Sequence, residues 1–175
     1  MRYCTTEKIY PGDESMEEQQ HTISVLVANK FGALARIAGL FSGRGYNIES
    51  LTVNRTHDPE LSRMTIVTTG NEAVLEQIEK QLGKLVDVES VVELDSTDYV
   101  ERELVLIKVV APSERRPEIL SLVDIFGAKI PLVLKDKIVV ELSGSSGKVE
   151  NFISLISDYG KIEIARSGRT AIPRK

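Results

Sequence analysis

The chain carries the same order of hydrophobic patterns twice, and this repetition limits its possible folds more than any other feature. In the first half, strand-like patterns cover four segments, at 21–28, 46–56, 62–69 and 86–94. Two further segments, 33–43 and 71–85, carry apolar residues three and four positions apart, which is typical of a helix buried along one face. The first half therefore predicts the order strand, helix, strand, strand, helix, strand.

The second half repeats this order. Strand-like patterns cover 104–111, 130–134, 138–142 and a last segment marked by Ile162 and Ile164. Helical spacing appears in two sets, which are Ile119, Leu122, Val123 and Phe126, and then Val149, Phe152, Ile153 and Ile156. We therefore predict an α+β chain of two tandem ferredoxin-like β-α-β-β-α-β domains, each a four-stranded antiparallel sheet with two helices on one face.

These patterns also set the expected boundaries. Residues 1–20 lack periodicity and are predicted to form a flexible arm. The first domain is expected at 21–95, a polar linker at 96–101, the second domain at 102–168 and a basic tail at 169–175. The sheet face without helices needs a cover in each domain, which either a second copy or the packing of one domain on the other would supply.

Composition excludes several classes of protein. The net charge of −4 argues against nucleic acid or an anionic membrane as the main partner. The single cysteine, Cys4, excludes an internal disulfide framework. The polar start carries no apolar run of the kind found in signal peptides, and no stretch approaches a membrane-spanning length. We therefore expect a cytoplasmic protein.

No catalytic cluster is evident in the sequence. His21 and His57 lie far apart and have no neighbouring cysteine or histidine, so metal-ligand spacing is absent. The glycine- and serine-rich stretch 143–148 departs from a phosphate-binding loop at Leu142 and Val149, where glycine and a hydroxyl residue are required. We interpret this stretch as a helix cap and predict no metal and no catalytic residue in the chain.

The turn at 29–34 is the most promising binding element. Gly32 lies where a strand passes into a helix, and its missing side chain lets a ligand approach the N–H groups of the first helical turn. We expect the start of the next strand, at Asn47 and Ile48, to lie close to this turn. This combination would suit a free amino acid. The helix N–H groups would bind its carboxylate and the amide oxygens its ammonium, and Leu34 and Ile48 would form an apolar wall for its side chain. Asn29 and Asn47 could instead be a helix cap and a turn residue.

Longer stretches make the chain similar to a known family. The turn Asn-Lys-Phe-Gly-Ala-Leu at 29–34 resembles that of ACT domains, which bind amino acids as allosteric effectors. Four other segments resemble the small regulatory subunit of acetolactate (acetohydroxyacid) synthase, namely 39–51, 61–65, 77–82 and 165–168. The similarity runs in order from about His21 to Gly168.

This resemblance implies an N-terminal ACT domain and a C-terminal ferredoxin-like domain. It also implies a homodimer in which two ACT domains pair and hold valine at their interface. Such subunits bind a separate catalytic subunit, activate it and confer feedback inhibition by branched-chain amino acids, whose biosynthesis the enzyme serves. Thiamine diphosphate, FAD and magnesium belong to the catalytic subunit, so no cofactor is expected in this chain.

The resemblance implies effector contacts at Asn29, Gly32 and Asn47, with Ala33, Leu34 and Ile48 beside them. The chain departs from the family in two places, which are its longer arm before His21 and its Lys30-Phe31 pair at the mouth of the expected site.

Two other classes of function remain open. A free-standing ACT sensor would bind an amino acid and regulate some other protein. The other class is a stand-alone enzyme on the same fold, such as an acylphosphatase. The arginine loop that is characteristic of acylphosphatases is missing from the first turn of this sequence.

Overall fold

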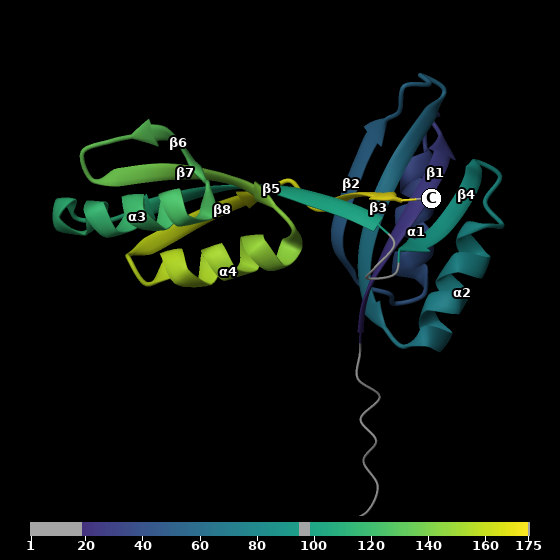
Figure 1. Cartoon of the computed structure of the whole chain (residues 1–175). Coiled ribbons are helices and arrows are strands. Elements are labelled where there is room, and N and C mark those ends of the chain that lie inside the picture. Colours follow the sequence, from purple (N-terminus) through teal and green to yellow (C-terminus); the bar gives the residue numbers. More distant parts are fainter. Residues whose placement is uncertain (1–18, 95–98, 175) are drawn as a thin grey trace, which may run out of the picture.

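The computed structural model describes residues 19–94 and 99–174. Figure 1 shows two sheets, each with two helices on one of its faces. The predicted pair of β-α-β-β-α-β units is confirmed. Among the described residues, none of the helices has the length and apolar character that crossing a membrane requires.

The first domain follows the predicted order of elements. They are β1 (Gln19–Ala28), α1 (Ala33–Gly43), β2 (Ile48–Arg55), β3 (Leu61–Gly70), α2 (Glu72–Leu82) and β4 (Val88–Leu94). The sheet order is β2-β3-β1-β4 and all neighbours are antiparallel. Asn71 caps α2, since its side chain accepts a hydrogen bond of 2.9 Å from the Val74 N–H. Alternate residues of β1 and β3 pack against both helices in one core, which includes Ile23, Val25, Ile37, Phe41, Ile66 and Ile78.

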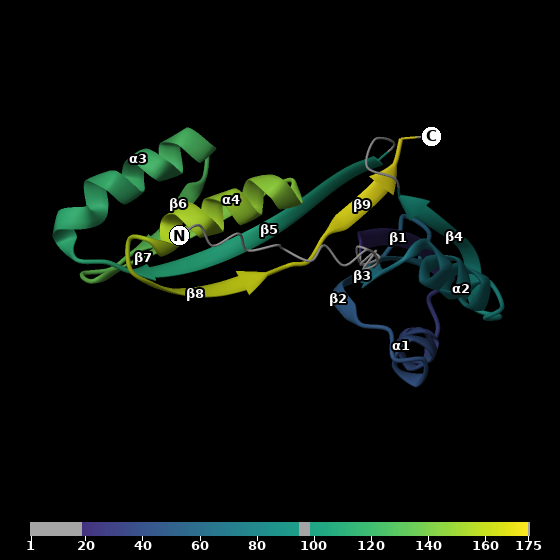
Figure 2. The same cartoon turned by 90° about the horizontal axis from the view of Figure 1, so that it is seen from below.

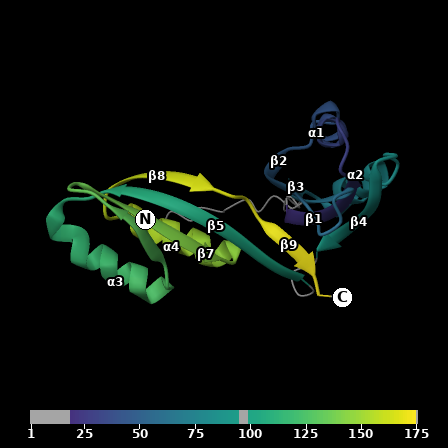
Figure 3. The same cartoon turned by 90° about the horizontal axis from the view of Figure 1, so that it is seen from above.

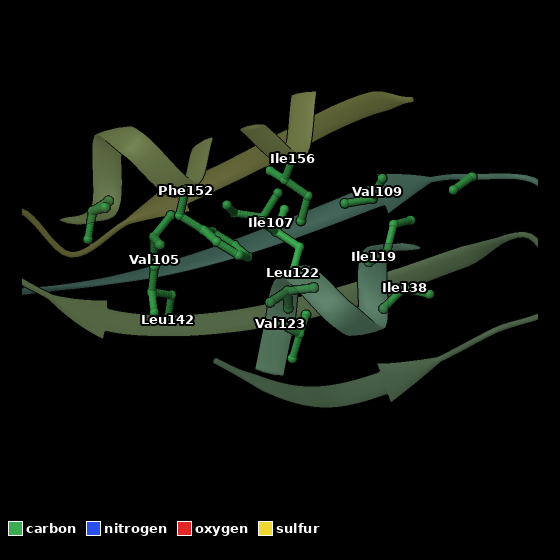
Figure 4. Close-up of a cluster of buried hydrophobic side chains, with 13 residues drawn as sticks. Val105, Ile107, Val109, Ile119, Leu122, Val123, Ile138, Leu142, Phe152 and Ile156 are labelled. Atoms are coloured by element: carbon green, nitrogen blue, oxygen red, sulfur yellow. The ribbon is translucent and has the colours of Figure 1, made fainter. Parts of the chain in front are cut away.

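The second domain repeats the plan and adds one strand. Its elements are β5 (Tyr99–Val110), a short 3-10 turn (Ser113–Arg115), α3 (Arg116–Phe126), β6 (Lys129–Val133), β7 (Lys137–Gly144), α4 (Ser146–Ser157), β8 (Lys161–Arg166) and β9 (Thr170–Pro173). Strands β6-β7-β5-β8 form the sheet in that order. Figure 4 shows side chains of β5, β7, α3 and α4 pointing toward one another, with Phe152 among them. Gly127 ends α3 in the left-handed conformation at φ 62°.

The boundaries of the second domain differ from the expected ones. Residues 99–101, assigned to the linker, belong to β5, and residues 170–173, assigned to the basic tail, form β9. These two segments pair with each other, from Tyr99 with Pro173 to Arg102 with Thr170. Residues 1–18, 95–98 and 175 lie outside the described residues, and with them most of the predicted arm and half of the predicted linker.

The start of β5 and all of β9 form a two-stranded ribbon that reaches from the second sheet to the first (Figures 2 and 3). The ribbon lies on the face of the first sheet that carries no helix. There the Ala171 N–H donates to Thr65 Oγ1 at 3.3 Å, and both residues are buried. Ser24, on the same face, is buried as well. Packing of one domain on the other therefore covers part of this face, which was one of the two expected alternatives.

Candidate functional site

The β1–α1 turn presents an uncapped helix N-terminus. Gly32 is the N-cap residue of α1, at φ 84° and ψ −7°, and no side chain among the described residues bonds the N–H groups of the first turn. Of these groups, the Ala33 N–H donates to the Lys30 carbonyl at 3.3 Å. This left-handed conformation suits glycine, because a Cβ is strained there. The first-turn N–H groups of a helix have no partner within it and carry the positive end of its dipole. The turn can therefore accept a carboxylate.

Asn29 does not cap this helix. Its Nδ2 donates to the Pro59 carbonyl at 2.8 Å, and its backbone N–H donates to the Glu60 carbonyl at 2.7 Å. The residue thus ties the β1–α1 turn to the turn between β2 and β3. Its amide oxygen accepts no hydrogen bond within the described part of the chain, which leaves an acceptor for an ammonium group.

Arg36 places a cationic side chain beside Gly32, which was not predicted from the sequence. Arg36 Nε donates to Asp87 Oδ2 at 2.7 Å, and Nη2 lies 2.5 Å from the same oxygen. The Nη1 atom lies 3.3 Å from the position that a Cβ on Gly32 would take. The only sequence signal was the spacing of four, which puts Arg36 one helical turn after Gly32. Asp87 neutralises most of its charge, but the Nη1 donors lie at the position where an effector carboxylate is expected.

The apolar residues near the turn have unequal exposure. Ala33 is 4% exposed and belongs to the first core, so its side chain faces the protein interior. Leu34 is 43% exposed, and Phe31 is fully exposed. Leu34 and Phe31 are therefore the apolar side chains that the turn can offer to a ligand or to another chain.

Asn47 and Ile48 lie at the other end of the sheet, so the expectation that they lie close to the turn is wrong for a single chain. Ile48 pairs with Thr68, whereas Ala28, just before the turn, pairs with Leu61. Seven residues of β3 separate these positions, or about 24 Å along an extended strand. The physical reason is that β1 and β2 are both antiparallel to β3 and so run parallel to each other. The helix between them returns the chain to the opposite end.

The surroundings of Asn47 are polar. Its Nδ2 donates to Glu49 Oε1 at 2.5 Å, and its carbonyl accepts from Thr68 Oγ1 at 2.6 Å. A hollow of about 510 Å³ lies beside it, lined by Gly45, Tyr46, Asn47, Glu49, Thr69, Gly70, Asn71 and Val74. Ile48 is part-buried against the first core. The structure therefore separates the candidate residues into a turn group (Asn29, Gly32, Ala33, Leu34) and a strand group (Asn47, Ile48).

The other motifs have structural roles. His21 Nδ1 lies 3.2 Å from Glu93 Oε1, and its Nε2 lies 3.1 Å from the Gly70 carbonyl. The described residues contain no group of three or more His, Cys, Asp or Glu side chains that could hold a metal ion. At the start of α4, the N–H and the hydroxyl of Ser146 both donate to Glu101 Oε1, at 2.9 and 2.5 Å. The stretch 143–148 lies at this helix N-terminus as expected, with Ser145 at the N-cap position, but the Ser145 side chain makes no capping hydrogen bond. The capping acceptor is the carboxylate of Glu101.

Two family models match the chain. Residues 102–175 match the one described as the small subunit of acetolactate synthase. Residues 23–90 match the AHAS small subunit-like ACT domain. Together they cover both folded domains.

Similar proteins carry the same description. The acetolactate synthase isozyme 3 small subunit of Escherichia coli is 53% identical over 153 residues, which are 87% of this chain and 94% of that protein. The probable acetolactate synthase small subunit of Archaeoglobus fulgidus is 52% identical over 155 residues, 89% of this chain and 97% of that protein. The crystal structure of the acetolactate synthase small subunit from Thermotoga maritima superposes with a TM-score of 0.81 at 43% identity, covering 90% of this chain and 98% of that one.

Proposed function

Because the chain belongs to the acetolactate synthase small-subunit family, we propose that it activates a separate catalytic subunit and makes it subject to feedback inhibition by valine or another branched-chain amino acid. The family and its ACT domain confirm the resemblance found in the sequence. Branched-chain amino acid biosynthesis follows from the family. Thiamine diphosphate, FAD and magnesium are proposed to reside on the catalytic subunit, and the holoenzyme is proposed to be cytoplasmic.

The uncapped N-terminus of α1 is the single observation that carries the effector proposal. An amino acid presents a carboxylate, which fits the first-turn N–H groups beside Arg36. The contrast with α4 supports this assignment, since Glu101 of the chain itself supplies the carboxylate there. The oxygen of Asn29, which accepts no hydrogen bond from the described residues, supplies an acceptor for the ammonium, and Leu34 supplies apolar contact.

The separation of Gly32 from Asn47 supports a site shared by two copies. Strands β2 and β4 are the edges of the first sheet. In a two-fold pair joined antiparallel through β2, the start of β2 in one copy meets the end of β2 in the other. That end of the sheet carries the β1–α1 turn. Asn47 of one copy is then about three strand spacings, ~14 Å, from the strand before Gly32 of its partner.

The other edge does not bring the two groups together. Pairing through β4 leaves five strand spacings between Asn47 and the partner's β1, or about 24 Å. We therefore propose a homodimer joined through the β2 edges of its ACT domains, with two effector sites at the interface. Each site takes the turn group from one copy and the strand group from the other.

Reconstitution tests the proposed function. The purified chain is mixed with an acetolactate synthase catalytic subunit, and acetolactate formation is followed with and without valine, leucine or isoleucine. The expected result is no turnover by the chain alone, higher turnover by the mixture, and inhibition by at least one of the three amino acids. Turnover by the isolated chain contradicts the regulatory role. Effector binding without any change in the mixture favours the alternative, a free-standing ACT sensor.

A further inference from the structure

Residues 167–169, which lead into the ribbon, contact β2, the strand that begins at the proposed effector residue Ile48. Thr52 Oγ1 donates to the Ser167 carbonyl at 3.3 Å, and the Arg169 N–H donates to Ser50 Oγ at 3.4 Å. Both hydroxyls project from β2, on the face opposite the helices. We name residues 167–169 together with Ser50 and Thr52 the joint. It lies where the chain passes from β8 to β9, between the two domains (Figures 2 and 3).

Gly168 is required at the joint for two reasons. Its φ of 78° lies in the left-handed region, where a side chain is strained. A Cβ there would also lie 2.7 Å from Ser50 Oγ and 2.7 Å from Thr52 Oγ1, which is too close for either atom. The backbone of Gly168 therefore lies directly against β2.

The preceding residues are fixed to the second domain. Glu103, almost fully buried, accepts two hydrogen bonds from Arg166, at 2.7 and 2.8 Å, and Glu150 lies 2.7 Å from Arg166 Nη1. The Ser167 N–H donates to the Leu104 carbonyl at 2.9 Å, and the Leu104 N–H donates to Ser167 Oγ at 3.0 Å. Residue 167 therefore belongs to the second domain, whereas residues 168 and 169 lie against the first.

The joint is close to the strand group along β2. Only two positions separate Ile48 from Ser50, or about 7 Å of extended chain. The pairing of β2 with β3 shifts register between these two residues, so the ladder is disrupted there and the start of β2 is less firmly held to β3. A displacement of Asn47 and Ile48 therefore reaches the hydroxyls at the joint without crossing a core.

We propose that the joint couples the effector site to the second domain, with Gly168, Ser50 and Thr52 as the positioning residues. Effector binding at the start of β2 changes how the ribbon lies on the sheet and so reorients the second domain. This inference rests on the proposed function, because it assumes that the effector binds at Asn47 and Ile48. A coupling residue differs from a binding residue in one measurable respect: its loss leaves affinity intact and removes the response.

Gly168→Ala tests the coupling, with Gly127→Ala as the matched control. Both glycines have positive φ, 78° and 62°, but a Cβ on Gly127 meets no atom within 4 Å. Two measurements are compared for each variant: valine binding to the small subunit by calorimetry, and valine inhibition of the reconstituted holoenzyme relative to its own uninhibited activity. For Gly168→Ala the expected valine affinity is within about threefold of wild type, whereas the maximal inhibition at saturating valine is largely lost. Gly127→Ala should change neither.

A second variant removes the same contacts without backbone strain. Ser50→Ala combined with Thr52→Val deletes both hydroxyls and should likewise reduce the maximal inhibition by valine while affinity stays near wild type. This variant decides the question if Gly168→Ala does not fold. If valine inhibition of the holoenzyme changes only as much as valine affinity does in both variants, the coupling role is overturned. Absence of valine binding to the wild-type chain overturns the effector proposal itself, and this inference with it.

Discussion

Replacing Gly32 with aspartate tests the proposed effector site most sharply. The new side chain starts from φ 84°, where a non-glycine residue costs about 1–2 kcal/mol. For a chain of this size that cost lowers the melting temperature by about 2–8 °C, so the variant should remain folded at assay temperature. Its Cβ would lie 3.3 Å from Arg36 Nη1, the end of a flexible side chain that can shift.

The effect on binding should exceed the effect on stability. The introduced carboxylate lies where the effector carboxylate is proposed to lie, and it competes for the first-turn N–H groups and for Arg36. Loss of one charge-assisted hydrogen bond costs about 1.5–3 kcal/mol. That corresponds to a decrease in valine affinity of about 10- to 100-fold, before repulsion between the two carboxylates is counted.

Calorimetry on Gly32→Asp and Gly32→Asn separates charge from shape. The asparagine variant has the same size and the same backbone strain but no negative charge, so it should lose less affinity. The reconstituted Gly32→Asp holoenzyme should keep its activity without valine and resist inhibition. Wild-type valine affinity in Gly32→Asp, or equal losses in the two variants, would refute the assignment of the carboxylate to this turn.

Three further changes have distinct expected outcomes. Asn47→Ala should weaken valine binding and leave the melting temperature almost unchanged, because its side chain bonds only the exposed Glu49 among the described residues; calorimetry and thermal unfolding check both. Burial and the neighbouring Glu93 raise the pKa of Glu79 above its ordinary value of 4.5, so its ionisation destabilises the fold as pH rises. Glu79→Gln should therefore raise the melting temperature at pH 7, and the gain should vanish below pH 4.5. Phe152→Ala should lower the unfolding free energy by about 3–5 kcal/mol in a urea titration, because the ring is fully buried.

The regular elements of the fold could be predicted because their information is local. Alternation in β1 and β3 and helical spacing in α1 to α4 each lie within one segment, and Asn71 and Gly127 mark helix ends by their residue type. Strand β9 was missed, since four residues ending in proline carry no periodic signal. It exists only through pairing with the start of β5, about seventy positions earlier.

The candidate site was predictable in part. Gly32 was identified because the need for glycine at a strand-to-helix turn is local. Arg36 was missed because its position depends on Asp87, which is distant in sequence. The distance between Gly32 and Asn47 was misjudged because the strand directions, and not the sequence separation, decide which ends meet. The separation of Gly32 from Asn47 within one chain is the reason for proposing a site built by two copies.

A subunit-mixing experiment tests the shared site most directly. Differently tagged Gly32→Asp and Asn47→Ala chains are combined, and the heterodimer is isolated and titrated with valine. In a shared site, both substitutions fall in one interface pocket of the heterodimer and the other pocket is intact. The account predicts one site of wild-type affinity per heterodimer, although each homodimer binds poorly. If every pocket of the heterodimer binds as weakly as in the homodimers, the two residues do not meet across an interface, and the shared site is contradicted.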